Sequence, residues 1–433
     1  MKFASLCLKT LLSIAVMSST SYAANTSSRT PVTKSELITS RDLNLKTIIK
    51  RALQGSPRLK SAKSAVAASK GKHTQSGLYV NPEINIQAEN IAGGGRYRGT
   101  QSAEITYGVS QVIETGGKRS KRKKMTQQDV AFSHYSQMLE TLDVIYEANL
   151  AYASAVAAQE MLRLADEQKK VAEDLYKEVS NRVKAAREPL IQKSKAQITL
   201  STTTFACERA KRNLSQAKFI ISNLWGEQED SFELEKTDFF NLTPPMTKAE
   251  VKKRIEENIY FKRMKTAQAR LEAQYELEKA NSLPDPRINV GVRDFRDTGH
   301  QAWVVGVSVP IPLFNQNQGN IKQALHEISK AKFDTKNTQL ELINAGYKAL
   351  EDQINAYQNA DNLKTSILPS AEKAFSLSFQ GYREGKLPYI EVLDALRTLF
   401  ELKEQYLSVL RDYHIAKAEV ERLTAKNVKH SEL

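Results

Sequence analysis

The chain has 433 residues and a formal net charge of +14, with 41% hydrophobic and 26% charged residues but only 18 Gly and 12 Pro. Few helix breakers and many charges favour long helices over a compact α/β enzyme, and no run approaches the roughly 18 apolar residues that a membrane-spanning helix needs. The 2 Cys and 6 scattered His exclude a disulfide framework and a thiolate metal site, and they argue against His-based catalysis or a bound cofactor.

The first 23 residues have the pattern of a secretory signal peptide. A basic start precedes a short apolar stretch at 10–17, and Ser21 and Ala23 supply small residues at a cleavage site. Cys7 lies before the apolar stretch, which does not fit lipoprotein processing; a short buried N-terminal helix is the alternative. We therefore expect an exported protein whose positive charge suits envelope polyanions or an acidic partner, and not nucleic acid.

Two halves of the chain, 43–225 and 247–425, pass through the same succession of patterns. Each half is expected to contain a short helix, a medium helix, two strands, a very long helix and a further medium helix. Pro189 of the first half corresponds to Pro388 of the second at an offset of 199. The sequence therefore predicts a duplicated unit.

Three further segments lie outside the two halves. Residues 24–42 form an N-terminal extension and residues 426–433 a C-terminal tail. Residues 226–246 are polar and contain Pro244 and Pro245, a composition typical of a connector.

The predicted long helices occupy 118–185, 319–383 and 388–425. In each, apolar residues recur at alternating steps of three and four, which gives an apolar seam for a coiled-coil neighbour. The first segment contains neither Gly nor Pro, and at 1.5 Å per residue it would reach roughly 100 Å. Helices of this length are expected to lie side by side in a bundle or a barrel wall.

Strands are predicted where apolar and polar residues alternate; Trp303 and Val305, for example, alternate with Val304 and Gly306. The length and the alternation match transmembrane β-strands, and soluble two-sided hairpins are the alternative. The four predicted strands span about 83–92, 101–113, 286–295 and 301–311.

Four strands cannot close a barrel, which needs about eight. An open sheet edge in lipid would also leave backbone N–H and C=O groups unpaired. Strands that cross a membrane here must therefore be shared between copies of the chain. Two copies would give a filled eight-stranded barrel and three copies a twelve-stranded one, and a transport role favours three.

Three local motifs flank the predicted strands: Val80-Asn81-Pro82-Glu83, Leu283-Pro284-Asp285-Pro286 and the run from Val309 to Ile321. In the longest motif Pro310 and Pro312 remove donors from a strand before a turn. With these motifs the chain resembles the TolC-type outer membrane factors over residues 43–425, and the motifs are most similar to the cobalt–zinc–cadmium resistance (CzcC-like) heavy-metal branch of that family.

The resemblance implies a mainly α fold with β: a long coiled-coil helical barrel plus four transmembrane strands per chain, shared in a trimeric twelve-stranded outer-membrane barrel. It also implies a long periplasmic part, contact with outer-membrane lipid, and two protein partners. These partners are a periplasmic adaptor (membrane fusion) protein and an inner-membrane transporter of the resistance–nodulation–division (RND) type.

The segment 381–395 resembles the second helix-to-helix turn of this family, with Gly385 at the tight turn. The resemblance implies that Glu391 and Asp394 ring the periplasmic aperture as a cation-attracting constriction and that Tyr382 helps to hold it closed. Their spacing places both acids on one helix face. Ordinary solvated acids beside an apolar seam are the alternative interpretation.

Two positions depart from the family pattern. Leu387 stands where TolC has a basic latch residue, and Gln192 stands where the first turn often has an acid, so fewer salt bridges are expected in the gate. The first turn also lacks the usual Gly. Residues of both turns, mostly charged, are predicted to contact the adaptor, with simple solvation of the charges as the alternative: Lys184, Arg187, Glu188, Arg383, Glu384, Gly385 and Lys386.

The predicted function is an outer-membrane exit duct of a tripartite, proton-driven RND efflux system that exports heavy-metal cations. Drug efflux or type I protein secretion through the same fold, or an exported coiled-coil spacer, are the alternatives. An enzyme is not expected, because the sequence contains neither a phosphate-binding P-loop nor a nucleophile elbow.

Overall fold

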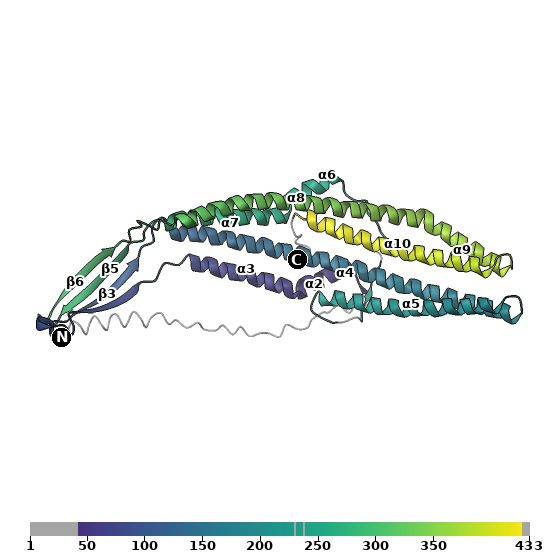
Figure 1. Cartoon of the computed structure of the whole chain (residues 1–433), viewed down its shortest axis with the longest axis horizontal. Coiled ribbons are helices and arrows are strands. Elements are labelled where there is room, and N and C mark those ends of the chain that lie inside the picture. Colours follow the sequence, from purple (N-terminus) through teal and green to yellow (C-terminus); the bar gives the residue numbers. More distant parts are fainter. Residues whose placement is uncertain (1–41, 229–230, 237–238, 427–433) are drawn as a thin grey trace. The chain divides into compact units, whose positions relative to one another are not determined.

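The computed structural model describes residues 42–228, 231–236 and 239–426 (Figure 1). The predicted signal peptide at 1–23, the extension up to residue 41 and the tail from residue 427 lie outside the described residues. The described part is mainly helical and contains one sheet of four antiparallel strands, which confirms the predicted fold class.

The first half follows the predicted order of elements. Two residues define where its first helices begin: the Asn44 side chain accepts the Thr47 N–H, and Pro57 opens the second helix. The elements are β1 (Asp42–Leu43), α2 (Leu45–Gly55), α3 (Pro57–Ser76), β2 (Glu83–Glu89), η1 (Gly95–Tyr97), β3 (Glu104–Val112), α4 (Lys118–Lys184) and α5 (Leu190–Asn223).

The second half repeats this order after the connector. Thr247 and Glu250 form a reciprocal capping box that starts its first helix. The connector contains β4 (Glu233–Leu234), and the elements of the second half are α6 (Lys248–Glu256), α7 (Ile259–Asn281), β5 (Arg287–Phe295), β6 (His300–Ser308), α8 (Gln318–Asn362), η2 (Leu363–Ile367), α9 (Leu368–Arg383) and α10 (Tyr389–Thr424).

One difference from the prediction lies in the segment expected to be a single helix over 319–383. The helix passes through a π-helical turn at Leu363–Ile367 and continues as α9, whose second residue is Pro369. Proline has no N–H to donate to the carbonyl four residues earlier, so the ladder widens for one turn and then resumes. The first half has no proline at this level, and α4 runs uninterrupted.

The connector also differs from a plain polar loop. Its short strand β4 pairs in parallel with β1, with Leu43 opposite Leu234. Phe232 and Phe239 are buried in the main hydrophobic core, and Gln159 of α4 donates to the Leu234 carbonyl at 3.0 Å. The connector is therefore packed across the middle of the long helices.

The sheet has the order β2-β3-β5-β6, so β2 and β6 are its two edges and pair with no further strand in the part of the chain that the structure describes. One row of the register joins Ile84, Val109, Val290 and Val305 across all four strands. The next row on this face, with Tyr107 and Trp303, is also apolar, whereas the other face carries mostly polar and small residues. On that face Arg293 pairs with Glu89 and Glu104, each at 2.8 Å.

The strands are shorter than the alternation alone suggests. After Glu89 the chain turns, because Asn90 and Ala92 both adopt φ of 58°. After Ser308 the ladder ends, because Pro310 cannot donate a hydrogen bond.

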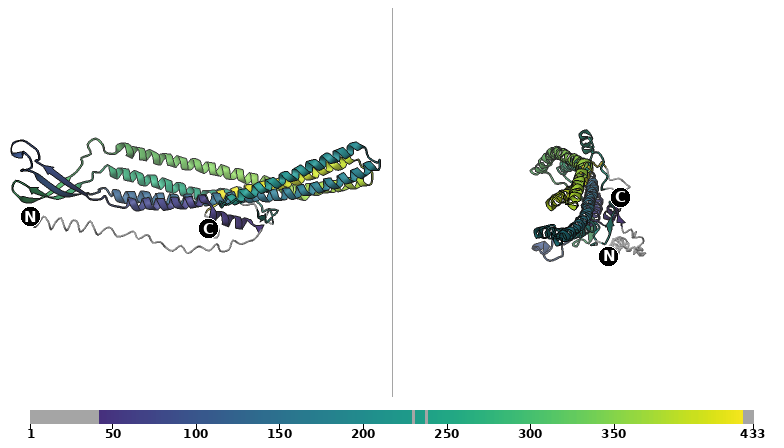
Figure 2. Two further views of the ribbon diagram at one scale, coloured as in Figure 1. Left: turned by 90° about the horizontal axis from the view of Figure 1, so that it is seen from below. Right: turned by 90° about the vertical axis from the view of Figure 1, so that its right-hand side faces the viewer.

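The long helices extend away from one end of the sheet and pack along one another. Helix α4 contacts α3, α5, α7 and α10, and α10 also contacts α8 and α9. The end-on view in Figure 2 shows these helices in a curved layer. Among the described residues no helix is both long and apolar enough to cross a membrane.

Candidate functional site

The end of the helices opposite the sheet contains two helix-to-helix turns (Figure 1). In the second turn Gly385 adopts φ of 77°, its N–H donates to the Tyr382 carbonyl at 2.9 Å, and the Lys386 N–H donates to the Gly381 carbonyl at 2.8 Å. This is the Schellman pattern that ends a helix with a left-handed residue. Pro388 then caps the returning helix α10.

The first turn repeats the same hydrogen bonds without a glycine. Ala186 adopts φ of 57° and donates to the Val183 carbonyl at 3.0 Å, and Arg187 donates to the Arg182 carbonyl at 2.9 Å. Pro189 caps α5 as Pro388 caps α10. The predicted offset of 199 thus joins two turns with the same backbone geometry.

Tyr382 is fully buried between helices of its own chain. Its ring lies 5.8 Å from the Tyr389 ring, and the Arg182 guanidinium from α4 stacks over it at 4.4 Å. Burial, and then the nearby Glu188 charge, raise the pKa of the Tyr382 hydroxyl. Among the described residues, no group lies in hydrogen-bonding geometry with that hydroxyl.

Arg182 joins the two helical hairpins at the tip. Its Nη2 donates to the Arg383 carbonyl at 2.8 Å, and its Nε donates to Glu178 at 3.0 Å. Sequence reasoning missed this residue, because its contacts with the second turn join positions about 200 apart. The only signal in the sequence is its place in the last turn of α4, where a cation suits the helix dipole.

Leu387 fills the position where a basic latch residue was expected from the family. Its side chain packs against Gly381, where an added Cβ would lie 2.8 Å from Leu387 Cδ1. Where the family has a basic residue, this chain therefore has an apolar contact, for which the glycine on α9 makes room.

Glu391 and Asp394 lie side by side on the exposed face of the first turns of α10. Tyr389, Val392 and Leu396 occupy the buried face of the same helix. Within the described residues neither acid makes an ion pair, so both carboxylates are open to the surroundings of a single chain. The structure thus brings the two acids together and separates them from buried Tyr382.

The charged residues of the two turns are mostly exposed. Lys386 pairs with Glu384 at 2.7 Å, and this contact, followed by Gln380, lowers the pKa of the Glu384 carboxyl. Arg383 lies 5.9 Å over the Phe379 ring. Those on the surface are Lys184, Arg187, Arg383, Glu384 and Lys386, whereas Glu188 is half-buried.

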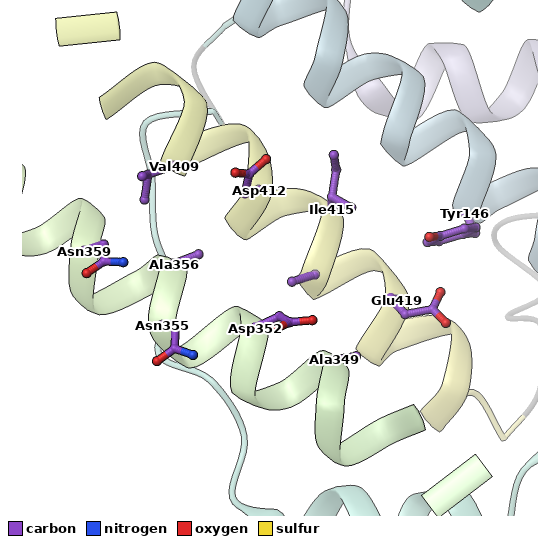
Figure 3. A pocket seen from close by; sticks show the side chains of 11 residues that line it. Tyr146, Ala349, Asp352, Asn355, Ala356, Asn359, Val409, Asp412, Ile415 and Glu419 are labelled. Carbon is purple, nitrogen blue, oxygen red and sulfur yellow. The ribbon is translucent and has the colours of Figure 1, made fainter. Parts of the chain in front are cut away.

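A groove of about 490 Å³ runs between α8 and α10 (Figure 3). Asp352 from α8 and Asp412 from α10 lie on its two sides, and Glu419 lies nearest to Tyr146 of α4. Arg422 holds Glu419 at 2.8 Å, and this hydrogen bond is the main reason that the pKa of Arg422 is raised. No group of three metal-ligating side chains occurs in the part of the chain that the structure describes.

Comparisons with known proteins give one matching family and several similar relatives. The family model for outer membrane efflux proteins matches residues 48–227 and 252–426. The cobalt-zinc-cadmium resistance protein CzcC of Cupriavidus metallidurans is 24% identical over 89% of this chain and 90% of its own. The nickel-cobalt-cadmium resistance protein NccC of Alcaligenes xylosoxydans is 22% identical over 82% of this chain and 80% of its own.

Solved structures share the fold. The outer membrane protein VceC of Vibrio cholerae superposes with a TM-score of 0.74 at 16% identity, covering 88% of this chain and 96% of its own. CusC superposes with a TM-score of 0.73 at 15% identity, covering 88% of this chain and 92% of its own.

Proposed function

The chain belongs to the outer membrane efflux protein family, and from that premise we propose that it forms the passive exit duct of a tripartite, proton-driven efflux system for heavy-metal cations. Membership makes it a TolC-type efflux channel of the outer membrane and not an enzyme. What we propose beyond membership is the substrate, the partner proteins and the number of chains in the complex.

The sheet carries the proposal of a shared barrel. The central rows of one face of the sheet are apolar in every strand, and both edges, β2 and β6, pair with no other strand among the described residues. A membrane leaves no water to satisfy such edges. Pairing β6 of one copy with β2 of the next satisfies both, and three copies give twelve strands, enough to enclose an open pore.

The heavy-metal substrate rests on the names of the relatives, which are resistance proteins for cobalt, zinc, cadmium and nickel. A conduit does not need to ligate the ion. A proton-driven RND transporter in the inner membrane would supply the energy, and a periplasmic adaptor would bridge to the two helical turns. We assign the adaptor contact to the exposed charges of these turns, including Lys184, Arg187 and Lys386.

Loss of the gene should make its host more sensitive to cobalt, zinc or cadmium salts, with unchanged sensitivity to hydrophobic drugs. The reverse pattern would replace the metal substrate with a drug. Unchanged sensitivity to both metals and drugs would contradict a role in the efflux of either.

We assign Glu391 and Asp394 to the narrow end of the duct, where three copies would place six carboxylates around one aperture. Such a ring attracts cations and repels anions. Replacing both, Glu391→Gln with Asp394→Asn, should lower the preference of single channels for cations in planar bilayers. The control Glu401→Gln with Glu404→Gln removes two acids deeper along α10, and an equal effect there would contradict the aperture assignment.

We also assign closure of the tip to the contact between Arg182, Tyr382 and Arg383. An adaptor opens such a tip only if it binds the open form more tightly than the closed one. The contact lies within one chain, so opening would separate the hairpin α4–α5 from the hairpin α9–α10.

A further inference from the structure

A pocket of about 560 Å³ lies where the first strand pair meets α4. Tyr79, Val80 and Ile113 form an apolar wall, and Lys118, Arg119 and Lys123 from the first two turns of α4 form a basic one. The lining also includes one acid, Glu114, whose carboxylate is paired with Arg122. The pocket therefore combines apolar and cationic surface at the level where the sheet ends.

The apolar wall continues the apolar face of the sheet. Gln111 also lines the pocket, and it pairs in register with Ile288, on the same face as Val109. Tyr79 is 72% exposed and Ile113 is 44% exposed. Exposed apolar side chains next to a membrane-facing surface are placed to meet lipid.

The basic wall belongs to an unusually cationic segment. Six of the seven residues 118–124 are Lys or Arg. Lys118 is held by Asp285 at 2.6 Å and Arg122 pairs with Glu114, so their charges are balanced within the chain. Arg119 and Lys123 make no ion pair within the described residues, and they supply the unbalanced charge of the pocket.

Arg119 is held in place by uncharged groups. Its Nε donates to the Gly77 carbonyl at 2.5 Å, and its guanidinium lies 3.8 Å above the Tyr79 ring. This leaves the two terminal nitrogens able to donate to a phosphate, in a geometry fixed before any ligand binds. The exposed Lys123 lies on the next turn of the same face.

The corresponding junction of the second half, between β6 and α8, is apolar but lacks the cluster of basic residues. Residues 318–324 contain a single basic residue, Lys322. The preceding turn exposes Ile311, Leu313 and Phe314 to 76%, 71% and 89%. Both junctions can contact lipid chains, and only the first has excess cations.

We propose that this pocket binds the headgroup of an anionic phospholipid of the phosphatidylglycerol class. Arg119 and Lys123 contact the phosphate, and Tyr79 and Ile113 contact the start of the acyl chains. The inference rests on the proposed crossing of the membrane by the strands. Each basic residue at a membrane surface contributes roughly fivefold to the affinity for anionic lipid.

The test uses the full protein extracted from outer membranes and reconstituted in nanodiscs that hold equal amounts of phosphatidylglycerol and phosphatidylethanolamine. Lipid that remains bound after delipidation is identified by mass spectrometry. The wild type should be enriched in phosphatidylglycerol. Lys123→Gln should reduce that enrichment roughly fivefold, and Arg119→Gln with Lys123→Gln should reduce it by more than tenfold.

The matched control, Lys322→Gln with Lys332→Gln, removes the same charge from exposed positions of α8 and should leave the enrichment unchanged. An equal loss in the control, or no enrichment in the wild type, would overturn the lipid site. So would protection of Lys123 from acetylation with no bound lipid, because a neighbouring copy would then cover the pocket.

Conductance of the same samples separates this inference from the proposed function. Normal conductance without enrichment overturns the lipid site alone. Failure of the protein to insert overturns the membrane crossing and the lipid site together.

Discussion

The two halves of the chain reach the same backbone with different residues. Ala186 and Gly385 both adopt the left-handed conformation in the turns, and Gly117 and Asn317 do the same before α4 and α8. Geometry is therefore repeated even where the residue best suited to it is absent. The turn hydrogen bonds and the following proline supply that geometry in each half.

Charge, in contrast, is not repeated. The second half has Glu391 and Asp394 where the offset of 199 gives Gln192 and Lys195 in the first half. The first half has six basic residues at the start of its long helix, and the second has one. The comparison teaches that duplication specifies the architecture, while each half has acquired its own chemistry.

The largest expected effect tests whether the two halves share one lipid-facing surface. Val109 and Val305 lie in one register row, so Val109→Arg and Val305→Arg should each destabilise the inserted state by about 2–4 kcal/mol near the middle of the bilayer. The measurement is the amount of heat-resistant oligomer in the outer membrane.

The control is Val304→Arg, one residue away on the polar face of the same strand. It should be tolerated far better, because that side chain points away from lipid. Equal damage by Val304→Arg and Val305→Arg would contradict the orientation of the sheet.

The next effect concerns the contact at the tip, to which the first half contributes Arg182 and the second half Tyr382. Arg182 of α4 stacks on Tyr382, so Arg182→Ala should weaken the closed tip by about 1–2 kcal/mol through the loss of a cation–π contact and a hydrogen bond. Single channels should open more often.

Tyr382→Phe provides the matched comparison. The Tyr382 hydroxyl has no hydrogen-bond partner within the described residues, so its removal should leave the open probability nearly unchanged. If Tyr382→Phe opens the channel and Arg182→Ala does not, the hydroxyl and not the ring carries the closure.

A smaller effect tests the repeated turn. Ala186 has φ of 57°, which costs an L-residue about 1 kcal/mol, so Ala186→Gly should slow hydrogen exchange of the turn amides several-fold. Gly385→Ala should speed exchange in the other turn by a similar factor. No change in either turn would mean that the surrounding helices, and not the turn residue, determine local opening.

The smallest effect concerns Cys207, whose counterpart at the same offset is Tyr406. Its thiol is buried and donates to Asp166 at 2.9 Å, and this bond, with burial, raises the pKa of the thiol. A raised pKa means less thiolate at a given pH, so alkylation should stay slow until the pH exceeds the usual thiol range.

The stabilising contribution of that bond is complete below the pKa of the unfolded thiol and is lost as the pH rises through the folded value. Asp166→Asn should speed alkylation of Cys207 at neutral pH. Equal alkylation rates in the two proteins would show that burial alone protects the thiol.

Much of the fold was predictable because periodicity reports which face of an element is buried. Alternation in the strands and steps of three and four in the helices are local patterns that survive in one sequence. The π-helical turn was not predictable, since a single Pro369 within a continuing apolar pattern does not show whether the helix ends or widens. The pair of β1 and β4 was missed because two residues are too short for a periodic signal.

The site was predictable only in part, for a related reason. Glu391 and Asp394 are neighbours along one helix, so their spacing alone places them together. Arg182 and Tyr382 meet across two hairpins, and no local pattern joins residues 200 positions apart. Leu387 looked like a missing latch, because its contact with Gly381 depends on the path of the turn.

The central claim is that several copies of this chain share one conducting barrel. The most direct test is the mass of the detergent-extracted complex from the outer membrane, followed by a planar-bilayer recording of the same sample. A complex of three chains that conducts ions is the predicted result. A monomer or dimer that carries no current would contradict the shared barrel and with it the proposed duct.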